Sequence, residues 1–285
     1  MNNAAAVQIS YFPGCSLATT ARENNQSLIE VCKYMGYRLA ELKDWNCCGS
    51  SSAHGIRPEL GFNLACRNLS LAPEGIPLLV ACPSCILHLR QAQSRLKRDE
   101  TARKDYESCW GRPVDLSLKI LHFFELMDGI DCLPNTTLNG LKFAPYYGCM
   151  LARPPELRHE KNYHGLMEKL LSCYGASSVR WSYSSRCCGT FLSAAKPEVA
   201  SPMVNRIVQN AVDSGAECIV TACAMCHLNI EIRCTLKRVV PIFHFSELLS
   251  IAFKTGTNKD WFARHLIDPA PLLKSRGLTG FHSII

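Results

Sequence analysis

The sequence predicts an α/β protein made of two related halves, each a small, mainly parallel sheet covered by helices. Two observations support this fold class. Apolar, strand-like segments alternate with helical segments along the 285 residues, a pattern typical of parallel sheets. The same order of segments then occurs a second time with cysteines at matching places, which indicates an internal duplication.

Each half begins with a short strand that leads into a glycine turn and a cysteine. The two segments are Val7 to Cys15 (VQISYFPGC) and Leu141 to Cys149 (LKFAPYYGC). A helical stretch follows in each half, at residues 21–35 and 163–174. Both stretches end at a glycine, as the C-termini of helices often do.

The middle of each half is a short strand followed by two adjacent cysteines. The strands are expected at residues 38–42 and 178–181, and the motifs after them read Asn-Cys-Cys-Gly and Arg-Cys-Cys-Gly. Neighbouring side chains point to opposite faces of a strand, so a vicinal pair that binds one centre requires an irregular turn. The glycine after each pair can supply the positive φ of such a turn.

A second helix, an apolar strand with a Cys-x-x-Cys pair, and a closing segment complete each half. The helices are expected at residues 59–71 and 197–214, and the closing segments read LHFFEL (121–126) and FHFSEL (243–248).

The matched segments of the two halves define the expected domains. They are a first repeat at 1–130, a turn-rich linker at 131–140, a second repeat at 141–255 and a C-terminal extension at 256–285.

The cysteine pattern is C-x31-CC-x33-CxxC in the first half and C-x37-CC-x34-CxxC in the second. A Cys-x-x-Cys turn brings two sulfurs to the same metal centre. Five thiols per half exceed the four ligands of a tetrahedral zinc ion, whereas a polynuclear iron–sulfur cluster with a bridging thiolate can use all five. Ten cysteines are therefore candidate ligands of the iron atoms of such clusters, and so of both the metal and the cofactor. They are Cys15, Cys47, Cys48, Cys82, Cys85, Cys149, Cys187, Cys188, Cys223 and Cys226.

Two other interpretations of these cysteines stay open at the level of sequence. One is a structural module with zinc bound by the thiolates of the Cys-x-x-Cys pairs. The other is a vicinal disulfide at either pair of adjacent cysteines. The ferredoxin spacing C-x2-C-x2-C-x3-C is absent from the sequence, so a partner protein is expected to bring or remove electrons.

Composition indicates the compartment and the class of protein. Seventeen cysteines without a basic and apolar leader favour metal sites in a reducing compartment over secreted disulfides. The longest apolar stretches are too short and too polar to cross a membrane, so we expect a cytoplasmic protein without a membrane span. The net charge of +7 counts every thiol as neutral; bound thiolates would offset it, and no nucleic-acid-binding motif is present.

The duplicated pattern resembles the B-type component of heterodisulfide reductase and the wider family of CCG-domain proteins. The motifs that carry the resemblance include Tyr11-Phe-Pro-Gly-Cys15, Asp44-Trp-Asn-Cys-Cys-Gly49 and Pro145-Tyr-Tyr-Gly-Cys149, which look like the bacterial members. The family spacing is C-x(31–39)-CC-x(35–36)-CxxC, so the second gaps here are one or two residues short. The resemblance covers nearly the whole chain.

The resemblance implies two noncubane [4Fe–4S] clusters, each held by the five cysteines of one half. It implies an oxidoreductase acting on sulfur within a multisubunit complex, which reduces or forms a disulfide between the clusters in two one-electron steps. It also implies a ferredoxin-like iron–sulfur partner (the family's C-type component), a flavin-containing partner (its A-type component) and a disulfide or thiol substrate. The alternative function within the family is an electron relay in a quinone- or organic-acid-linked oxidoreductase.

Two histidines near the motifs are further candidates. His54 follows the first Cys-Cys-Gly and is a candidate proton donor to a departing thiolate. His227 adjoins Cys226 and is a candidate for a hydrogen bond to a cluster sulfur. For both residues, a purely structural histidine is the alternative.

Overall fold

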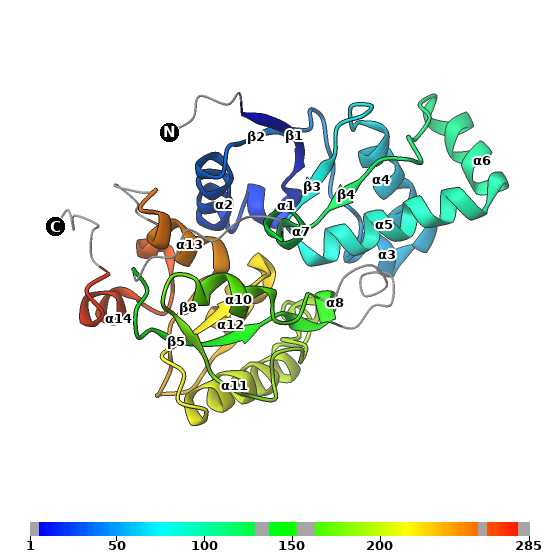
Figure 1. Ribbon diagram of the computed structural model, residues 1–285. Helices are drawn as coiled ribbons and strands as arrows, with labels where there is room; N and C mark the ends of the chain where they lie inside the picture. Colours follow the sequence, from blue (N-terminus) through cyan, green and yellow to red (C-terminus); the bar gives the residue numbers. More distant parts are fainter. Residues whose placement is uncertain (1–5, 129–136, 153–162, 256–260, 279–285) are drawn as a thin grey trace.

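The computed structural model describes residues 6–128, 137–152, 163–255 and 261–278 as two α/β halves that lie side by side (Figure 1). Each half contains a four-stranded sheet whose strand pairs are all parallel, in the orders β2-β1-β3-β4 and β6-β5-β7-β8. The two orders correspond strand for strand, which confirms the predicted α/β fold with two repeats. The strands are β1 (Val7–Phe12), β2 (Tyr37–Glu41), β3 (Leu78–Val80), β4 (Ile120–Leu121), β5 (Lys142–Tyr146), β6 (Ser177–Ser178), β7 (Cys218–Thr221) and β8 (Ile242–His244).

Helices connect the parallel strands and cover the sheets, as parallel strands require. In the first half they are α1 (Gly14–Ala18), α2 (Arg22–Tyr34), α3 (Ser52–Ile56), α4 (Pro58–Ser70), α5 (Pro83–Arg98), α6 (Glu100–Trp110) and α7 (Phe123–Met127). In the second half and the extension they are α8 (Gly148–Ala152), α10 (Leu166–Ser172), η1 (Thr190–Leu192), α11 (Pro197–Asp213), α12 (Ala224–Arg233), α13 (Phe245–Phe253), η2 (Phe262–Arg264) and α14 (Ala270–Ser275).

Most predicted elements are found within one or two residues of their expected bounds, but β6 and α10 are shorter. Strand β6 has only two residues, Ser177 and Ser178, which pair with Lys142 and Phe143 of β5. The ladder ends next to Pro145, which has no amide hydrogen; its carbonyl accepts a hydrogen bond from the Trp181 indole, at 3.0 Å. Helix α10 begins only after Gly165, which has a φ of +89°.

A shared apolar core joins the two halves. The central strands β3 and β7 are buried along their whole length, as expected for parallel strands covered on both faces. The rings of Phe123 and Phe124 from the first half lie 4.7 and 5.0 Å from the ring of Phe245 in the second. Helix α13 also packs on α2, where the buried hydroxyls of Ser27 and Ser246 are 2.7 Å apart. The halves are therefore not independent units.

The closing segments form matching helix caps. His122 and His244 each cap a helix, and the glutamate three residues later, Glu125 or Glu247, accepts a hydrogen bond from the backbone amide of its histidine. This is a capping box with histidine in place of serine or threonine. In the first half, the guanidinium of Arg90 on α5 forms a largely buried ion pair with Glu125, at 2.8 Å.

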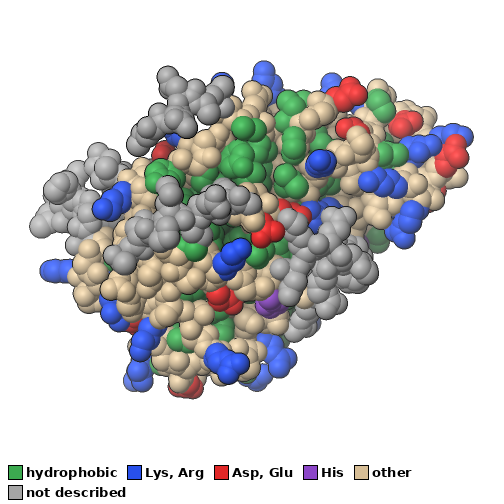
Figure 2. All heavy atoms as spheres, viewed as in Figure 1, with side chains coloured by type: hydrophobic (Ala, Val, Ile, Leu, Met, Phe, Trp, Pro, Cys, Tyr) green, Lys and Arg blue, Asp and Glu red, His purple; other side chains and the backbone are tan. Residues whose placement is uncertain are grey.

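The predicted linker at 131–140 lies mostly outside the described residues, as do parts of the extension at 256–260 and 279–285. The described part of the extension is packed against the rest of the molecule. Trp261 is buried, and its indole donates a hydrogen bond to Gln26 Oε1 on α2, at 2.9 Å. On the face drawn in Figure 2, Lys and Arg side chains are spread around the molecule and do not gather in one patch.

Candidate iron–sulfur site

The candidate ligands of the first half lie at the carboxyl ends of three neighbouring strands. Cys15 is in the first turn of α1, directly after β1, and the vicinal pair Cys47 and Cys48 lies in the irregular segment after β2. Cys82 is the N-cap residue of α5, after β3, and Cys85 is in the first turn of that helix. Because the strands are parallel, these ends meet at one edge of the sheet, the usual place for a ligand in such folds.

The sulfur atoms of the first half form one connected group. The Sγ atoms of Cys15 and Cys47 are 3.9 Å apart. The Cys85 thiol is hydrogen bonded to both Cys48 and Cys82, and these bonds, together with burial, raise its pKa well above the ordinary value. The pKa of Cys48 is lowered because Cys47 and Cys85 donate to its sulfur. Five sulfurs that share protons in this way can be deprotonated together by a metal centre.

The second half repeats this arrangement. The Sγ atoms of Cys188 and Cys226 are 3.3 Å apart, and Cys226 is also hydrogen bonded to Cys223, so its pKa is raised well above normal. Cys149 is hydrogen bonded to Cys187, which, together with burial, raises the Cys149 pKa. The sequence pattern therefore converges in space in both halves.

Glycines make room for these sulfurs. Gly14 and Gly148, each directly before the first cysteine of its half, have φ values of +72° and +68°. A Cβ atom on Gly14 would lie 2.9 Å from Cys85 Sγ, and one on Gly148 would lie 3.4 Å from Cys226 Sγ. The thiol-rich donor set and the space kept free around it fit an iron–sulfur cluster in each half.

The glycine after each vicinal pair has the predicted conformation. Gly49 and Gly189 have φ values of +84° and +77°. Cβ atoms at these positions would lie 2.9 Å from the backbone of Gly61 and 3.1 Å from Met203 Sδ. Each vicinal pair is thus held in an irregular turn beside the helix that follows it.

The two cysteine groups lie along the same seam between the halves. Helix α1, which carries Cys15, contacts α12, which carries Cys226; reciprocally, α8 with Cys149 contacts α5 with Cys85. A small cavity of about 20 Å³ within the second group is lined by all five of its cysteines and by Pro83 and Ser84 of the first half. The remaining lining residues, mainly Tyr147, Met150, Phe191 and Met225, include no charged side chain. One half therefore helps to form the surroundings of the other half's cysteines.

The two candidate histidines lie in different surroundings. His54 is exposed on α3, and its ring lies edge-on to the ring of His88, with centroids 5.8 Å apart. Its proposed role as proton donor stays a prediction. His227 is buried, but its ring nitrogens face Asn24 and Glu231 and not a cysteine sulfur. The expected bond from His227 to a cluster sulfur is therefore wrong for this arrangement, because Asn24 and Glu231 take up both ring nitrogens.

A known domain family accounts for both halves. The profile of the CCG cysteine-rich domain matches residues 9–90 and residues 143–231, together more than half of the chain. The chain belongs to the CCG family. Each matched region contains one complete CCG cysteine group, so the duplication inferred from spacing corresponds to two CCG domains.

Components of oxidoreductase complexes are similar to this CCG protein. The 8-methylmenaquinol:fumarate reductase membrane anchor of Wolinella succinogenes is 28% identical over 284 residues, covering 93% of this chain and 99% of that anchor. The B-type component of the CoB-CoM heterodisulfide reductase of Methanosarcina acetivorans is 28% identical over 209 residues, covering 66% of this chain and 70% of that component. A protein of Archaeoglobus profundus that is itself described as like the B-type component of heterodisulfide reductase is 26% identical over 242 residues, covering 79% of this chain and 81% of that protein.

The comparison with solved structures concerns the fold alone. The crystal structure of a hypothetical protein from Helicobacter pylori superposes with a TM-score of 0.70 at 11% sequence identity, and the match covers 91% of this chain. The chain spans about half of that protein, 51%. Among the helices of the described residues, none has the length and apolar character needed to cross a membrane.

Proposed function

We propose that this chain is the iron–sulfur component of a multisubunit oxidoreductase, in which it carries electrons between a partner protein and a quinol-type substrate. One cluster would be held by Cys15, Cys47, Cys48, Cys82 and Cys85, and the other by Cys149, Cys187, Cys188, Cys223 and Cys226. When bound, such clusters would supply one-electron transfer at iron, in the noncubane form that the resemblance to the B-type component of heterodisulfide reductase implies.

The observation that carries the proposal is the common seam of the two cysteine groups. The reciprocal contacts of α1 with α12 and of α5 with α8 hold both groups close to the boundary between the halves. The chain's own contribution is to bury the sulfurs, keep water away from most of them and fix their positions through the first turns of α5 and α12. Two centres beside one seam suit a two-electron substrate that reacts in single-electron steps.

The apolar surroundings of the second group favour a quinol over a charged substrate. The residues that line the space of this group beside its five cysteines are uncharged, so they offer no counter-ion for a sulfonate, phosphate or carboxylate near the cluster. Exposed apolar side chains also follow each Cys-Cys-Gly motif, namely Ile56 and Leu60 in the first half and Phe191, Leu192 and Val199 in the second. The similarity over 99% of the quinol:fumarate reductase anchor supports the same substrate class.

Disulfide reduction is the second candidate. The duplication itself favours it, since a disulfide has two equal sulfur atoms and the chain places two equivalent cysteine groups beside one seam. The similarity to two heterodisulfide reductase B-type proteins supports it as well. In either function, a ferredoxin-like protein and a flavin-containing protein of the same complex are the proposed electron partners.

The test begins with anaerobic iron and sulfide analysis, which should give about eight of each for two [4Fe–4S] clusters. The purified protein, reduced and then mixed with a menaquinone analogue or with a mixed disulfide, should be reoxidised by the quinone. Cys47→Ser should abolish this reaction, whereas Cys109→Ser, at an exposed cysteine outside both groups, should not. Reoxidation by the disulfide alone would favour the second candidate, and a colourless, zinc-loaded protein would contradict both.

A further inference from the structure

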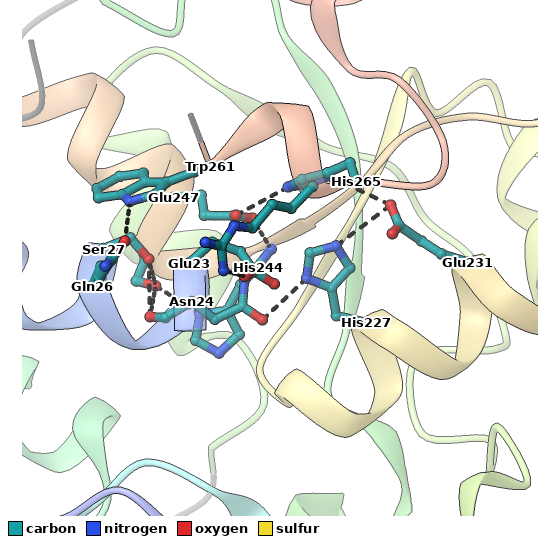
Figure 3. Close-up of polar contacts among 12 residues, drawn as sticks. Glu23, Asn24, Gln26, Ser27, His227, Glu231, His244, Glu247, Trp261 and His265 are labelled. Carbon is teal, nitrogen blue, oxygen red and sulfur yellow. Dashed lines mark hydrogen bonds and ion pairs between the residues drawn. The ribbon is translucent and has the colours of Figure 1, made fainter. Parts of the chain in front are cut away.

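A second group of metal-type ligands lies outside the cysteine seam. His227 and Glu231 are one helical turn apart on α12, and His265 follows η2 in the C-terminal extension (Figure 3). The side chains of these three residues are 4%, 3% and 1% exposed. They bring together two imidazoles and a carboxylate, a common set of ligands for zinc.

The first half explains why this group is unusual. Glu231 lies five residues after the last cysteine of its half, which is the position of Arg90 in the first half. There, Arg90 neutralises Glu125. In the second half the position of Arg90 is taken by the acid Glu231, and His265 lies between it and Glu247, the equivalent of Glu125. The duplicated fold has thus replaced a cation with an anion at a buried position.

One nitrogen of each histidine is already held by a hydrogen-bond acceptor. His227 Nδ1 lies 3.2 Å from Asn24 Oδ1 on α2, and His265 Nε2 lies 3.0 Å from Glu247 Oε1 on α13. These acceptors fix the tautomer of each ring, with the proton on the nitrogen that faces the acceptor. Such contacts from amide or carboxylate oxygens orient the histidine ligands of metal sites.

The other nitrogen of each histidine faces Glu231 at a distance typical of two ligands on one ion. His227 Nε2 and His265 Nδ1 lie 3.5 and 3.4 Å from Glu231 Oε1. All three atoms are buried and have no hydrogen-bond partner among the described residues. In a tetrahedral zinc site with bonds of about 2.0–2.2 Å, neighbouring ligand atoms are separated by roughly 3.3–3.6 Å.

The local charge and space also suit a divalent cation. Three carboxylates, Glu23, Glu231 and Glu247, lie in or beside the group, and Arg264 approaches Glu23 at 3.8 Å. A cavity of about 70 Å³ adjoins the group and is lined by Glu23, Asn24, Arg264 and three ligand residues. This volume holds a water molecule, which can complete four-coordination beside the protein ligands.

We propose that His227 Nε2, His265 Nδ1 and Glu231 bind one zinc ion, distinct from the iron–sulfur centres. Ligand atoms of His227, His265 and Glu247 lie within 4.8 Å of one another, so the second carboxylate is near enough to balance the charge of the ion. The site joins α12 to the extension directly and to α2 through Asn24. Its role is to fix the extension and the first half against the second CCG domain.

The competing arrangement has a proton in place of the metal. In that case His265 is an imidazolium between two carboxylates: burial lowers its pKa, but Glu247 and Glu231 together raise it to about 10. The two arrangements differ in the zinc content of the protein and in the atoms that surround the zinc ion. They can therefore be separated without any measurement of enzymatic activity.

The deciding experiment is metal analysis with zinc X-ray absorption on the anaerobically purified, cluster-loaded protein. We expect about one zinc per chain beside the iron, with a shell of nitrogen and oxygen at ~2.0–2.1 Å. A sulfur shell at ~2.3 Å would place the zinc on cluster cysteines and overturn the proposal. Protein that contains no zinc, and takes up none when zinc sulfate is added, would also overturn it and support the protonated His265.

Variants of the proposed ligands give a second, independent test of the zinc site. Glu231→Gln and, separately, His265→Gln should lose at least nine-tenths of the zinc while the iron content stays the same. The matched control is Glu198→Gln, a carboxylate exposed on α11, which should keep both metals. Zinc retained at the wild-type level in both test variants would refute the ligand assignment. If a variant fails to fold and loses iron as well, the zinc X-ray absorption of the wild-type protein tests the ligand assignment by itself.

Discussion

Replacing Gly14 with alanine should remove the iron–sulfur cluster of the first half alone. Gly14 and Gly148 are equivalent residues with almost the same positive φ, so Gly148→Ala is a matched control. They differ in the distance from an added Cβ to the nearest cysteine sulfur, 2.9 Å to Cys85 for Gly14 and 3.4 Å to Cys226 for Gly148.

The magnitude follows from these two distances. Placing alanine in a left-handed conformation costs about 1–2 kcal/mol at either position. A contact of 2.9 Å is far inside the ~3.5–4.0 Å of favourable packing, so Gly14→Ala carries a further ~1–3 kcal/mol of overpacking or displaces Cys85 Sγ. Metal sites tolerate deviations of only about 0.2 Å in ligand distance, so the displaced sulfur can no longer serve the cluster. At Gly148, a small shift of the sulfur relieves the contact.

The assay combines iron analysis with thermal unfolding under anaerobic conditions. Gly14→Ala should retain about four of the eight irons, and Gly148→Ala about eight. Gly148→Ala should still unfold at a slightly lower temperature, in keeping with the cost of its backbone conformation alone. Equal iron content in the two variants would show that Cys85 is not held where the cluster ligands require it, and the reasoning from glycine to cluster would fail.

Two further predictions concern stability. Arg90→Met should destabilise the fold by about 3–5 kcal/mol, because it leaves the buried carboxylate of Glu125 unpaired; Arg95→Met, at a solvent-exposed pair with Glu59, should cost below ~1 kcal/mol in chemical denaturation. The buried His122 has its pKa lowered to about 4 by desolvation. Because the unfolded histidine titrates near ~6.5, stability is lost as the pH falls from about 6.5 towards 4, by about 2 kcal/mol at pH 5. His122→Asn keeps an acceptor at the helix cap and should remove that part of the acid sensitivity; an unchanged pH profile would contradict a neutral, buried His122.

The sequence was sufficient to predict the duplication, the parallel sheets and the convergence of the cysteines. Cysteine spacing and strand–helix alternation are local signals that do not depend on how the halves meet. The glycine after each vicinal pair was predicted to have a positive φ, and Gly49 and Gly189 do. Strand β6 was predicted too long because the effect of Pro145 acts through its partner strand, which a scan of the segment itself does not include.

The contacts between distant segments could not be predicted in the same way. His227 was considered only beside its sequence neighbour Cys226, but its ring faces Asn24, more than 200 residues earlier in the chain. The contact between Glu231 and His265 was not predicted, because one residue lies in an ordinary helical stretch and the other outside the repeat. The sequence did contain one signal: the charge at equivalent positions of the two repeats changes from positive at Arg90 to negative at Glu231. A buried charge that changes sign after duplication requires a new counter-ion from elsewhere.

The exchange of Arg90 for Glu231 has a consequence for synthesis of the chain. In the first repeat, the buried acid at residue 125 meets its cation from residue 90, so both partners have been made when the repeat ends. In the second repeat, the buried acids at 231 and 247 meet His265, which is translated only after the repeat itself. Folding during translation proceeds from the N-terminus, so the second repeat reaches its final charge balance last. Its buried acids at 231 and 247 acquire their partner only when the extension has docked.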